Sequence, residues 1–418
     1  MKPRGGSLDE PGRTTVTVPT SDLVLDPYDY DFHEDPYPYY QRLRDEAPLY
    51  RNDEIGFWAL SRHTDVLQGF RNSTTLSNKY GVSLDPASRG PHAAKTMSFL
   101  AMDDPAHLRL RTLVSKGFTP RRIRELEPRV TEIAVQHLDT MLEKAQSGTV
   151  DYVEEFAGKL PMDVISELMG VPEPDRDQVR GWADDVMHRD DGVTDVPPAA
   201  VDASINLIVY YQGMVAERRR KPTDDLTTAL LEAEIDGDRL TDDEVLGFMF
   251  LMVIAGNETT TKLLANAAFW GHKNPDQLVP VYADLERVPL WVEETLRYDT
   301  SSQILARTVV GDLTLYDTKI PDGDVVLLLP GSGHRDERVF DEPDRFLIGR
   351  DIGAKLLSFG SGAHFCLGAH LARMEARVAL TELLKRIRRY EVDEAGAVRV
   401  HSSNVRGFAH LPITLEIN

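Results

Sequence analysis

The sequence feature that most constrains the fold is an apolar helix that begins close to residue 241. Thr241 and Glu244 form the Thr-x-x-Glu pattern of a capping box, in which each side chain satisfies a backbone group at the start of a helix. Residues 245–256 are then apolar on nearly every face. Because a helix without a polar face must be surrounded by protein, we expect a long central helix within a large, mainly α-helical domain.

Polar residues follow halfway along this expected helix. Small Ala255 and Gly256 leave room beside the backbone, and Glu258 and Thr259 come directly after Asn257. A buried carboxyl group and hydroxyl group cost free energy unless they are satisfied. One explanation is purely structural, since a threonine hydroxyl can bond to a carbonyl one turn earlier and bend a helix.

The chain has a single cysteine, Cys366, which lies in the segment 359–368. No disulfide can therefore form within the chain. Two glycines precede the cysteine and one follows it, and glycines permit backbone angles and close approaches that a Cβ would block. A helical pattern covers residues 367–389, and a helix N-terminus favours a thiolate. On this segment alone, an inert buried thiol remains an alternative.

The order Phe-x-x-Gly-x-x-x-Cys-x-Gly in residues 359–368 resembles the haem-binding loop of the cytochrome P450 family, in which a cysteine thiolate binds haem iron. Further matches occur in the family's order at residues 102–111, 255–259 and 294–297. The resemblance implies a single-domain fold, mainly α with a smaller β region. Haem b would lie between the central helix and the helix after the loop, with Cys366 as the metal ligand.

Four basic residues match family positions that meet the haem propionates: His107, Arg111, Arg307 and His364. The first two are four residues apart and share one face of an expected helix. Without the resemblance they would indicate only a solvated basic face. A guanidinium group suits a carboxylate, because it can donate two parallel hydrogen bonds.

Two further matches concern catalysis and structure. Glu258 and Thr259 match the acid and the alcohol of the family's oxygen-activation motif. Glu294 and Arg297 match its Glu-x-x-Arg pair, which in the family is buried and joined by a later arginine. Arg345, in Pro-Asp-Arg-Phe, is the expected third member. We expect these last three residues to be structural.

The resemblance also places a substrate pocket near the irregular segment 72–100 and near residues 300–304. A long loop inside a compact domain is usually functional or disordered. Ser301 stands where relatives commonly have proline, so this loop departs from the family pattern. The expected apolar lining residues are Met97, Phe99, Leu100, Ala255, Ser302 and Ile304. A steroid, a terpenoid, a branched lipid or a polyketide would be compatible with such a lining.

Composition narrows the class of protein further. The formal net charge of −21 favours solubility and argues against nucleic-acid binding. Residues 1–20 are polar, without the apolar core of a signal peptide or anchor, so we expect a flexible tail followed by one domain over residues 21–418. No apolar run reaches about 18 residues, so no membrane-spanning helix is expected. One cysteine fits a reducing cytoplasm, and we expect a monomeric protein of the soluble bacterial type.

The resemblance implies a haem-thiolate monooxygenase that hydroxylates an apolar small molecule with dioxygen. Electrons from NAD(P)H would arrive through a reductase and an acidic ferredoxin-type donor, which opposite charge would steer to the surface. Solvated charge without a partner is the alternative for the basic residues that we assign to this docking face: Lys116, Arg121, Arg122, Arg124, Arg373 and Arg377. A break at residues 190–198 is expected to be a mobile lid connection.

Three other functions are weighed against this one. A peroxide-driven haem peroxygenase would not need the Glu258–Thr259 pair, because peroxide brings its own protons. A haem-based sensor or binding protein would need neither this pair nor the long pocket loop. Zinc binding at Cys366 is disfavoured, since no second group of ligands is spaced around it.

Overall fold

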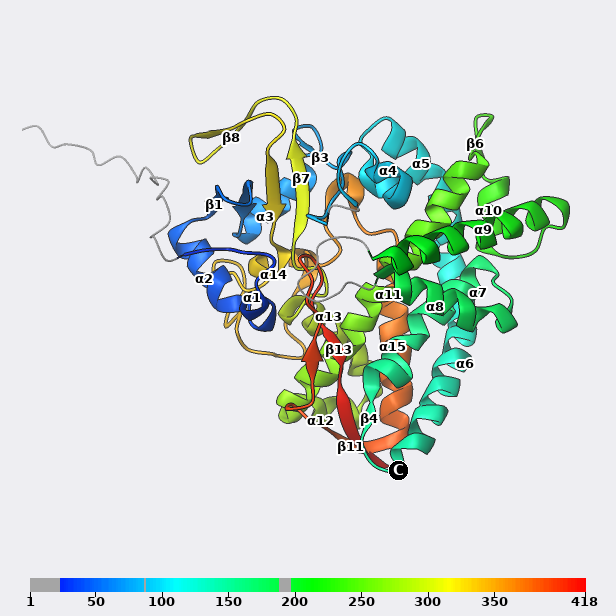
Figure 1. Ribbon diagram of the computed structural model, residues 1–418. Coiled ribbons are helices and arrows are strands. Elements are labelled where there is room, and N and C mark those ends of the chain that lie inside the picture. Colours follow the sequence, from blue (N-terminus) through cyan, green and yellow to red (C-terminus); the bar gives the residue numbers. More distant parts are fainter. Residues whose placement is uncertain (1–22, 86–87, 188–196) are drawn as a thin grey trace, which may run out of the picture.

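The computed structural model describes residues 23–85, 88–187 and 197–418, and these form one body with a large helical part and a smaller β part (Figure 1). The predicted flexible tail at residues 1–20 and most of the predicted lid connection at 190–198 lie outside the described residues. The predicted fold class, mainly α with a smaller β region, is confirmed.

The helices account for most of the described chain. They are α1 (Tyr30–Glu34), α2 (Tyr37–Glu46), α3 (His63–Arg71), α4 (Ala93–Met97), α5 (Ala106–Ser115), α6 (Pro120–Ala145), α7 (Lys159–Met169), α8 (Arg176–Met187), α9 (Pro198–Arg220), α10 (Leu226–Glu232), α11 (Asp242–Lys273), α12 (Pro275–Ala283), α13 (Val288–Tyr298), α14 (Pro330–Gly333) and α15 (Ala369–Arg386).

The strands form small sheets. They are β1 (Leu49–Asn52), β2 (Phe57–Leu60), β3 (Leu76–Ser77), β4 (Val150–Asp151), β5 (Glu234–Ile235), β6 (Asp238–Arg239), β7 (Leu305–Val309), β8 (Leu313–Leu315), β9 (Thr318–Ile320), β10 (Val325–Leu328), β11 (Ile387–Val392), β12 (Val398–Arg399), β13 (Phe408–His410) and β14 (Pro412–Ile417). The largest sheet has the order β1-β2-β10-β7-β3, with β2 and β10 parallel and the other neighbours antiparallel. A second sheet has the order β11-β14-β4.

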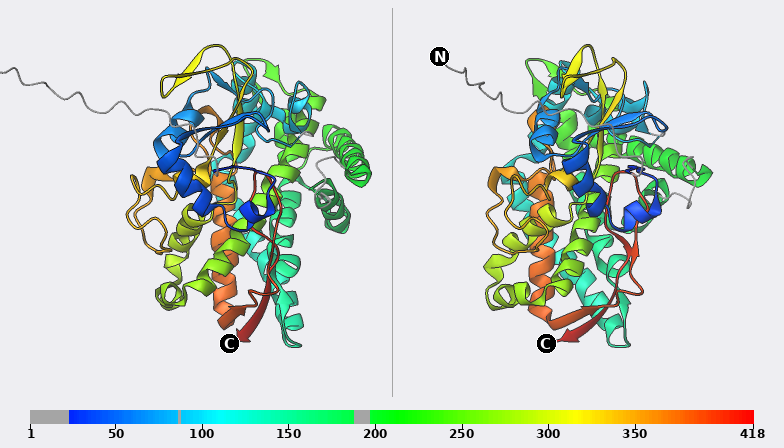
Figure 2. Two further views of the ribbon diagram at one scale, coloured as in Figure 1. Left: turned by 60° about the vertical axis from the view of Figure 1, so that its left-hand side comes forward. Right: turned by 90° about the vertical axis from the view of Figure 1, so that its left-hand side faces the viewer.

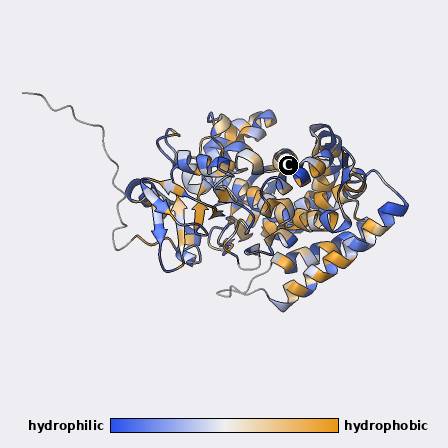
Figure 3. Cartoon of the chain, turned by 90° about the horizontal axis from the view of Figure 1, so that it is seen from above, coloured by the Kyte–Doolittle hydropathy of each residue, from blue (hydrophilic) through white to orange (hydrophobic). Residues whose placement is uncertain are grey.

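The central helix is α11, which begins with the predicted capping box between Thr241 and Glu244. It packs against α7, α9, α13 and α15, and most of its residues from Val245 onward are buried. Two further views show α11 and α15 running side by side through the helical part (Figure 2). In a view coloured by hydropathy, α9 lies along an outer edge of the helical part (Figure 3). No helix within the described residues is both long and apolar enough to cross a bilayer.

The helix predicted at residues 367–389 ends earlier in the structure, at Arg386. That helix is the shorter α15, because from Ile387 onward the backbone pairs with β14. There the side chains of Ile387, Tyr390 and Val392 are buried. Pairing within the second sheet thus ends the helix three residues before the pattern predicted.

Candidate active site

The loop 359–368 holds Cys366 just before α15 begins. The backbone N–H of Cys366 donates to the carbonyl of Phe359 at 2.9 Å, which closes the loop on itself. Gly360 and Gly362 have φ angles of +65° and +74°, in the left-handed region that favours glycine. A Cβ at Gly362 would also lie 3.2 Å from backbone atoms of Phe70 and Arg71, so α3 packs tightly against this turn.

A cavity of about 440 Å³ lies between this loop and α11, within the size range of small-molecule sites of about 300–1,000 Å³. The structure brings most of the predicted residues to it. The predicted residues that line the cavity are Met97, Phe99, Leu100, Arg111, Ala255, Glu258, Thr259, Ser302, Arg307, His364 and Cys366.

Two predicted residues lie elsewhere. The prediction that Ile304 lines the pocket is wrong: its side chain is buried among Tyr40, Ala306 and Leu327 in a separate apolar cluster. Along β7 the side chains alternate between two faces, so Leu305 and Arg307 line the cavity whereas Ala306 faces the apolar cluster, and Ile304 lies on the same side as Ala306. His107 does not line the cavity itself, but its ring lies 3.9 Å from that of His364, centre to centre.

The side chain of Cys366 is exposed, and the space it faces is the cavity. Burial among protein atoms raises the pKa of the thiol, whereas the backbone N–H of Gly368 and the nearby charge of Arg111 oppose this rise. Burial is the largest of these influences, so the protein by itself disfavours the thiolate. A bound metal cation deprotonates a coordinating thiol, so ligand binding would supply the missing stabilisation of the thiolate.

Within the described part of the chain, neither of the two arginines beside Cys366, Arg111 and Arg307, forms an ion pair. Arg307 is 4% exposed, and its one hydrogen bond among the described residues goes to the carbonyl of Ala306 at 2.7 Å. Burial lowers the pKa of Arg307 to about 10. Burial, together with the neighbouring charges of His107 and the two arginines, lowers the pKa of His364 to about 3.

The histidines of this cluster also have unused nitrogens. Nε2 of His107 and Nδ1 of His364 are buried without a hydrogen-bond partner among the described residues. Of the carboxylates in the described ranges, one contacts the group, that of Asp104 at 3.2 Å from Nδ1 of His107. Buried charges are normally paired, so the cluster fits an anionic group beside the thiol. The two carboxylates of a haem meet this description, and the donor set therefore fits haem.

Glu258 and Thr259 reach the same cavity from α11. The hydroxyl of Thr259 donates to the carbonyl of Ala255 at 3.0 Å, which is the structural contact considered above. The helix nevertheless continues to Lys273, and both Glu258 and Thr259 line the cavity. The pair therefore faces the space above Cys366 as well as supporting its own helix.

Glu294 and Arg297 form a fully buried ion pair with N–O distances of 2.7 and 2.9 Å. The prediction that Arg345 is the third member is wrong, because its side chain is 61% exposed and pairs with Glu342. Arg350 takes that place, with Nε at 3.4 Å from Glu294. The turn at residues 342–347 directs only the backbone carbonyl of Arg345 inward, where it accepts a bond from Arg297 at 3.0 Å.

Sequence reasoning missed two buried acidic residues, Asp299 and Glu375. Asp299 is fully buried and contacts Tyr37, Trp270 and Arg406 at 2.7, 2.8 and 2.8 Å. Glu375 of α15 lines the cavity, and burial raises its pKa well above the ordinary value. A single Asp or Glu outside a motif does not show from the sequence that it is buried. Only Asp299 could have been suspected, because it directly follows the Glu-x-x-Arg-Tyr segment.

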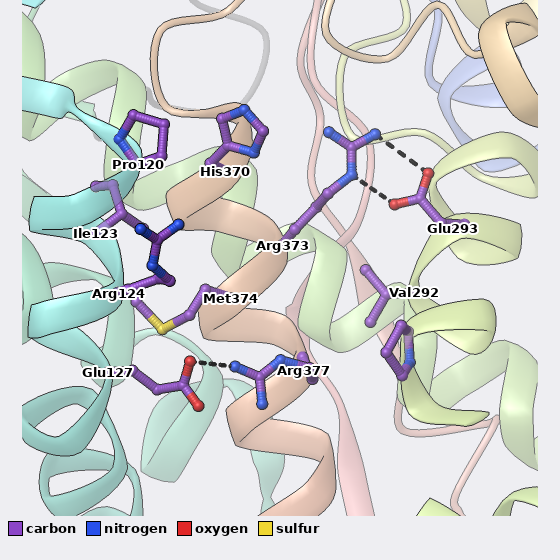
Figure 4. A pocket seen from close by; sticks show the side chains of 11 residues that line it. Pro120, Ile123, Arg124, Glu127, Val292, Glu293, His370, Arg373, Met374 and Arg377 are labelled. Carbon is purple, nitrogen blue, oxygen red and sulfur yellow. Dashed lines mark hydrogen bonds and ion pairs between the residues drawn. The ribbon is translucent and has the colours of Figure 1, made fainter. Parts of the chain in front are cut away.

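Of the predicted docking residues, Arg124, Arg373 and Arg377 line a groove of about 400 Å³ between α6, α13 and α15 (Figure 4), whereas Lys116, Arg121 and Arg122 are not among its lining residues. Arg373 pairs with Glu293 at 2.5 Å, and Arg377 pairs with Glu127 at 2.6 Å. Arg121 and Arg122 pair with Glu125 and Asp224 at 2.7 and 3.1 Å. Local acids thus offset much of the positive charge that the sequence suggested for this face.

Comparisons with known proteins agree with this geometry. The profile of the family described as "Cytochrome P450" matches residues 202–408. The "Putative cytochrome P450 123" of Mycobacterium tuberculosis is 71% identical over 402 residues, which cover 96% of this chain and 99% of the relative.

Solved structures give the same result for the fold. Cytochrome P450 CYP109Q5 from Chondromyces apiculatus superposes with a TM-score of 0.85 at 35% identity, covering 94% of this chain and 98% of that chain. CYP109E1 from Bacillus megaterium, solved in complex with corticosterone, superposes with a TM-score of 0.82 at 30% identity, covering 92% and 99%. With its lone cysteine at the cavity and these relatives along nearly its whole length, the chain belongs to the cytochrome P450 family of haem-thiolate monooxygenases.

Proposed function

We propose that this protein hydroxylates an apolar small molecule, using dioxygen and electrons from NAD(P)H. The observation that carries the proposal is that the only thiol of the chain and the Glu258–Thr259 pair line one cavity. A sulfur ligand and a proton-handling pair on the same space are what oxygen activation requires. The proposed domain is the whole span of residues 21–418, and the proposed location is the cytoplasm.

The proposed cofactor is haem b, held by Cys366 through its sulfur. When bound, it supplies the oxygen chemistry, and a thiolate ligand favours cleavage of the O–O bond. Arg307 and Arg111 would pair with the propionates, and the free nitrogens of His107 and His364 would donate to them. These pairings would satisfy the charges and nitrogens that the protein alone leaves without partners.

The proposed role of the α11 pair is to hold and deliver protons on the cavity side of the helix. The Thr259 hydroxyl is held 3.0 Å from the carbonyl of Ala255, which fixes its position at the cavity surface. Glu258, one residue earlier, would pass protons from solvent to this hydroxyl. A group that donates or accepts a proton in catalysis must be held within hydrogen-bond reach of its partner, and a packed helix holds both side chains in place.

The proposed substrate is a largely apolar molecule. Aromatic and aliphatic side chains of Phe99, Leu100, Phe248 and Leu251 make up much of the cavity wall. The relative CYP109E1 has been solved with corticosterone, which supports a steroid-sized substrate. We retain terpenoids, branched lipids and polyketides as other classes of the same size and polarity.

The proposed electron donor is an acidic ferredoxin served by a reductase, docking on the groove between α6, α13 and α15. Arg124 is exposed at this groove. Arg373 and Arg377 already have protein carboxylates as partners, so donor carboxylates would have to share them. Docking is therefore expected to be weak and strongly dependent on salt.

The decisive experiment is a difference spectrum of the reduced, haem-loaded protein with and without carbon monoxide. Thiolate ligation predicts a band at about 450 nm, and Cys366→Ala should abolish it. A band at shorter wavelength in the wild-type protein would contradict the ligand assignment. Turnover with hydrogen peroxide but none with a reductase and ferredoxin would instead favour a peroxygenase.

Thr259→Ala tests the role of the α11 pair. The variant should bind haem normally, consume NAD(P)H, and release peroxide in place of product, because protons reach the oxygen without control. The ratio of product to NAD(P)H consumed measures this. Thr261→Ala is a matched control, since Thr261 makes the same bond to a helix carbonyl, that of Asn257, but does not line the cavity. An unchanged ratio in Thr259→Ala would remove Thr259 from the proton path.

A further inference from the structure

The outward side of α9 is apolar, although this helix lies along an outer edge of the helical part (Figure 3). Four large apolar side chains are exposed within nine residues of α9: Val201, Ile205, Ile208 and Val209. Ile205 and Val209 are 54% and 60% exposed. Single exposed apolar residues are ordinary at a protein surface, but a contiguous group of them marks an interaction site.

Helical geometry places Ile205 and Val209 on one line along the outward side, because residues four apart lie nearly above one another. The line continues through Gly213, where an added Cβ would meet no atom within 4 Å. On the opposite side α9 packs against α8, α10 and α11, and Leu207 and Tyr211 are fully buried there. We name the outward line the α9 face, and all its residues are exposed: Asp202, Ile205, Val209, Gly213, Ala216 and Arg220.

The two ends of the α9 face carry opposite charges. Asp202 lies near its start and Arg220 at its end, and no charged residue occurs between positions 203 and 216. Within the described part of the chain, neither Asp202 nor Arg220 forms an ion pair, and Arg220 donates only to the carbonyl of Ala216 at 3.3 Å. The neighbouring Arg219, in contrast, pairs with Asp242. One acid and one base are therefore available at opposite ends of an uncharged strip.

This arrangement makes the α9 face complementary to a second copy of itself. A two-fold axis midway between Val209 and Gly213 is also midway between Asp202 and Arg220. Two antiparallel α9 helices related by that axis would set each Val209 against the partner's Gly213 and each Asp202 against the partner's Arg220. The small Gly213 leaves room for close approach, and each end gains an opposite charge.

A lipid surface is the other partner that an apolar helix face could meet. Helices that lie on membranes carry lysine and arginine along their polar flanks. The exposed flanks of α9 instead carry Asn206, Gln212 and Glu217, and the net charge of −21 opposes binding to anionic lipid. The chemistry of the α9 face thus favours a second copy of the chain.

We propose that two copies of this protein associate through their α9 faces, packed antiparallel about a two-fold axis. The proposal is independent of the proposed function, and it replaces the monomer expected from the sequence, which does not show which side of an apolar helix is exposed. Ala200 and Ser204, on the inner side of α9, line the cavity, so the second copy would lie behind a cavity wall.

The size of the α9 face sets the expected strength of the dimer. A helix of this length spans roughly 34 Å, so contact through one helix from each copy lies at the small end of specific interfaces, which bury about 800 Å² per partner. We therefore expect a weak dimer, with a dissociation constant on the order of 10 µM.

Sedimentation velocity of the full-length, haem-loaded protein measures this association. Between about 1 and about 200 µM, the weight-average sedimentation coefficient should rise from that of a monomer towards that of a dimer. The ionic strength should be about 0.15 M, because two chains of net charge −21 repel each other in dilute salt. A monomer at every concentration overturns the proposal.

Val209→Glu locates the interface. It should raise the dissociation constant at least about 30-fold, because each dimer would bury two unpaired carboxylates. Val279→Glu is the matched control, since Val279 of α12 is also exposed, at 65%, and the variant should associate like the wild type. A dimer that persists in Val209→Glu, or that is lost equally in Val279→Glu, overturns the proposal.

Exchange of the two end charges tests the antiparallel arrangement. Asp202→Arg or Arg220→Asp alone places like charges opposite each other at both ends, and each should weaken association about 3–10-fold. The double variant restores opposite charges in the reverse sense and should return to within about two-fold of the wild type. A double variant no better than the single ones overturns the antiparallel arrangement. Binding of a monomeric wild type, but not of Val209→Glu, to phosphatidylglycerol vesicles would assign the α9 face to lipid and overturn the proposal.

Discussion

Two arginines in the interior of this protein have opposite surroundings. Arg297 is fully buried and donates to both carboxylate oxygens of Glu294 and to the carbonyls of His334, Pro343 and Arg345. Arg307 is almost as buried, yet among the described residues it donates only to the carbonyl beside it, and it lies 5.6 Å from the ring of Phe70. Both cations have been taken out of water, but Arg297 is bonded to a carboxylate, whereas the nearby charge of Asp103 acts on Arg307 without a hydrogen bond in the described part of the chain.

This difference distinguishes a buried charge that stabilises the fold from a buried charge that is available to a ligand. A buried charge costs several kcal/mol unless it is paired and hydrogen-bonded. Around Arg297 the protein satisfies its own charges, so removing one member exposes the cost of the others. Around Arg307 the protein does not offset the free-energy cost of the buried charge. A ligand that carries negative charge would offset it. An incomplete polar network beside a cavity therefore indicates a ligand site.

Arg297→Met tests the complete network and should have the largest effect. It leaves the buried carboxylate of Glu294 with Arg350 as its only cation, at 3.4 Å. We expect a loss of about 3–5 kcal/mol in the free energy of unfolding, measured by urea denaturation of the haem-free protein. Arg345→Met is the control, because this exposed side chain pairs only with Glu342 and should change stability by less than about 1 kcal/mol. Equal effects of the two substitutions would mean that the sequence-based assignment of Arg345 was right.

Arg307→Met tests the incomplete network and should act in the opposite direction. Burial lowers the pKa of Arg307 to about 10, so the folded protein carries a cost for this charge. Its removal should raise the stability of the haem-free protein by up to about 3 kcal/mol, while the variant loses haem faster. Stability comes from urea denaturation, and haem loss comes from transfer to a haem acceptor such as apomyoglobin. A haem-free variant that is destabilised as strongly as Arg297→Met would show that Arg307 is structural.

The sequence was sufficient for the parts of the molecule that depend on local pattern. The capping box at Thr241, the apolar run after it and the glycines around Cys366 each predict a shape that the structure contains. These features depend on neighbouring residues, so their physics can be read from one segment. The family resemblance added which distant segments would meet at the cavity.

The errors and omissions concern contacts between distant segments. Arg345 and Arg350 are both arginines in the same turn, and only the path of the backbone decides which one points inward to Glu294. Ile304 is apolar and close to Ser302, yet it lies on the same side of the chain as Ala306, in another cluster, whereas Leu305 and Arg307 line the cavity. The docking arginines Arg373 and Arg377 were predicted as unpaired charge. Their partners, Glu293 and Glu127 respectively, lie on other helices and are remote in sequence, so the pattern gave no sign of the pairing.

Asp299→Asn sharpens the comparison, because Asp299 belongs to a second buried network of charges that the protein satisfies itself. Burial alone would raise the pKa of this carboxyl, but Arg406, Arg399 and the bonds from Trp270 and Tyr37 lower it from 3.8 to about 2. A lowered pKa means that the ionised carboxylate adds stability at neutral pH. That stability is present above the unfolded value of 3.8 and is lost as the pH falls through about 2.

The pH dependence gives this prediction its measurement. The shift corresponds to about 2 kcal/mol, so the gap in unfolding free energy between wild type and Asp299→Asn should narrow with acid, by about 1 kcal/mol between about pH 6 and about pH 3. Urea denaturation of both proteins at each pH measures the gap, and taking the difference cancels the other carboxylates. A gap that stays constant over this range would mean that the charge of Asp299 does not stabilise the fold. The segment that follows Asp299 would then be held by backbone bonds and packing alone.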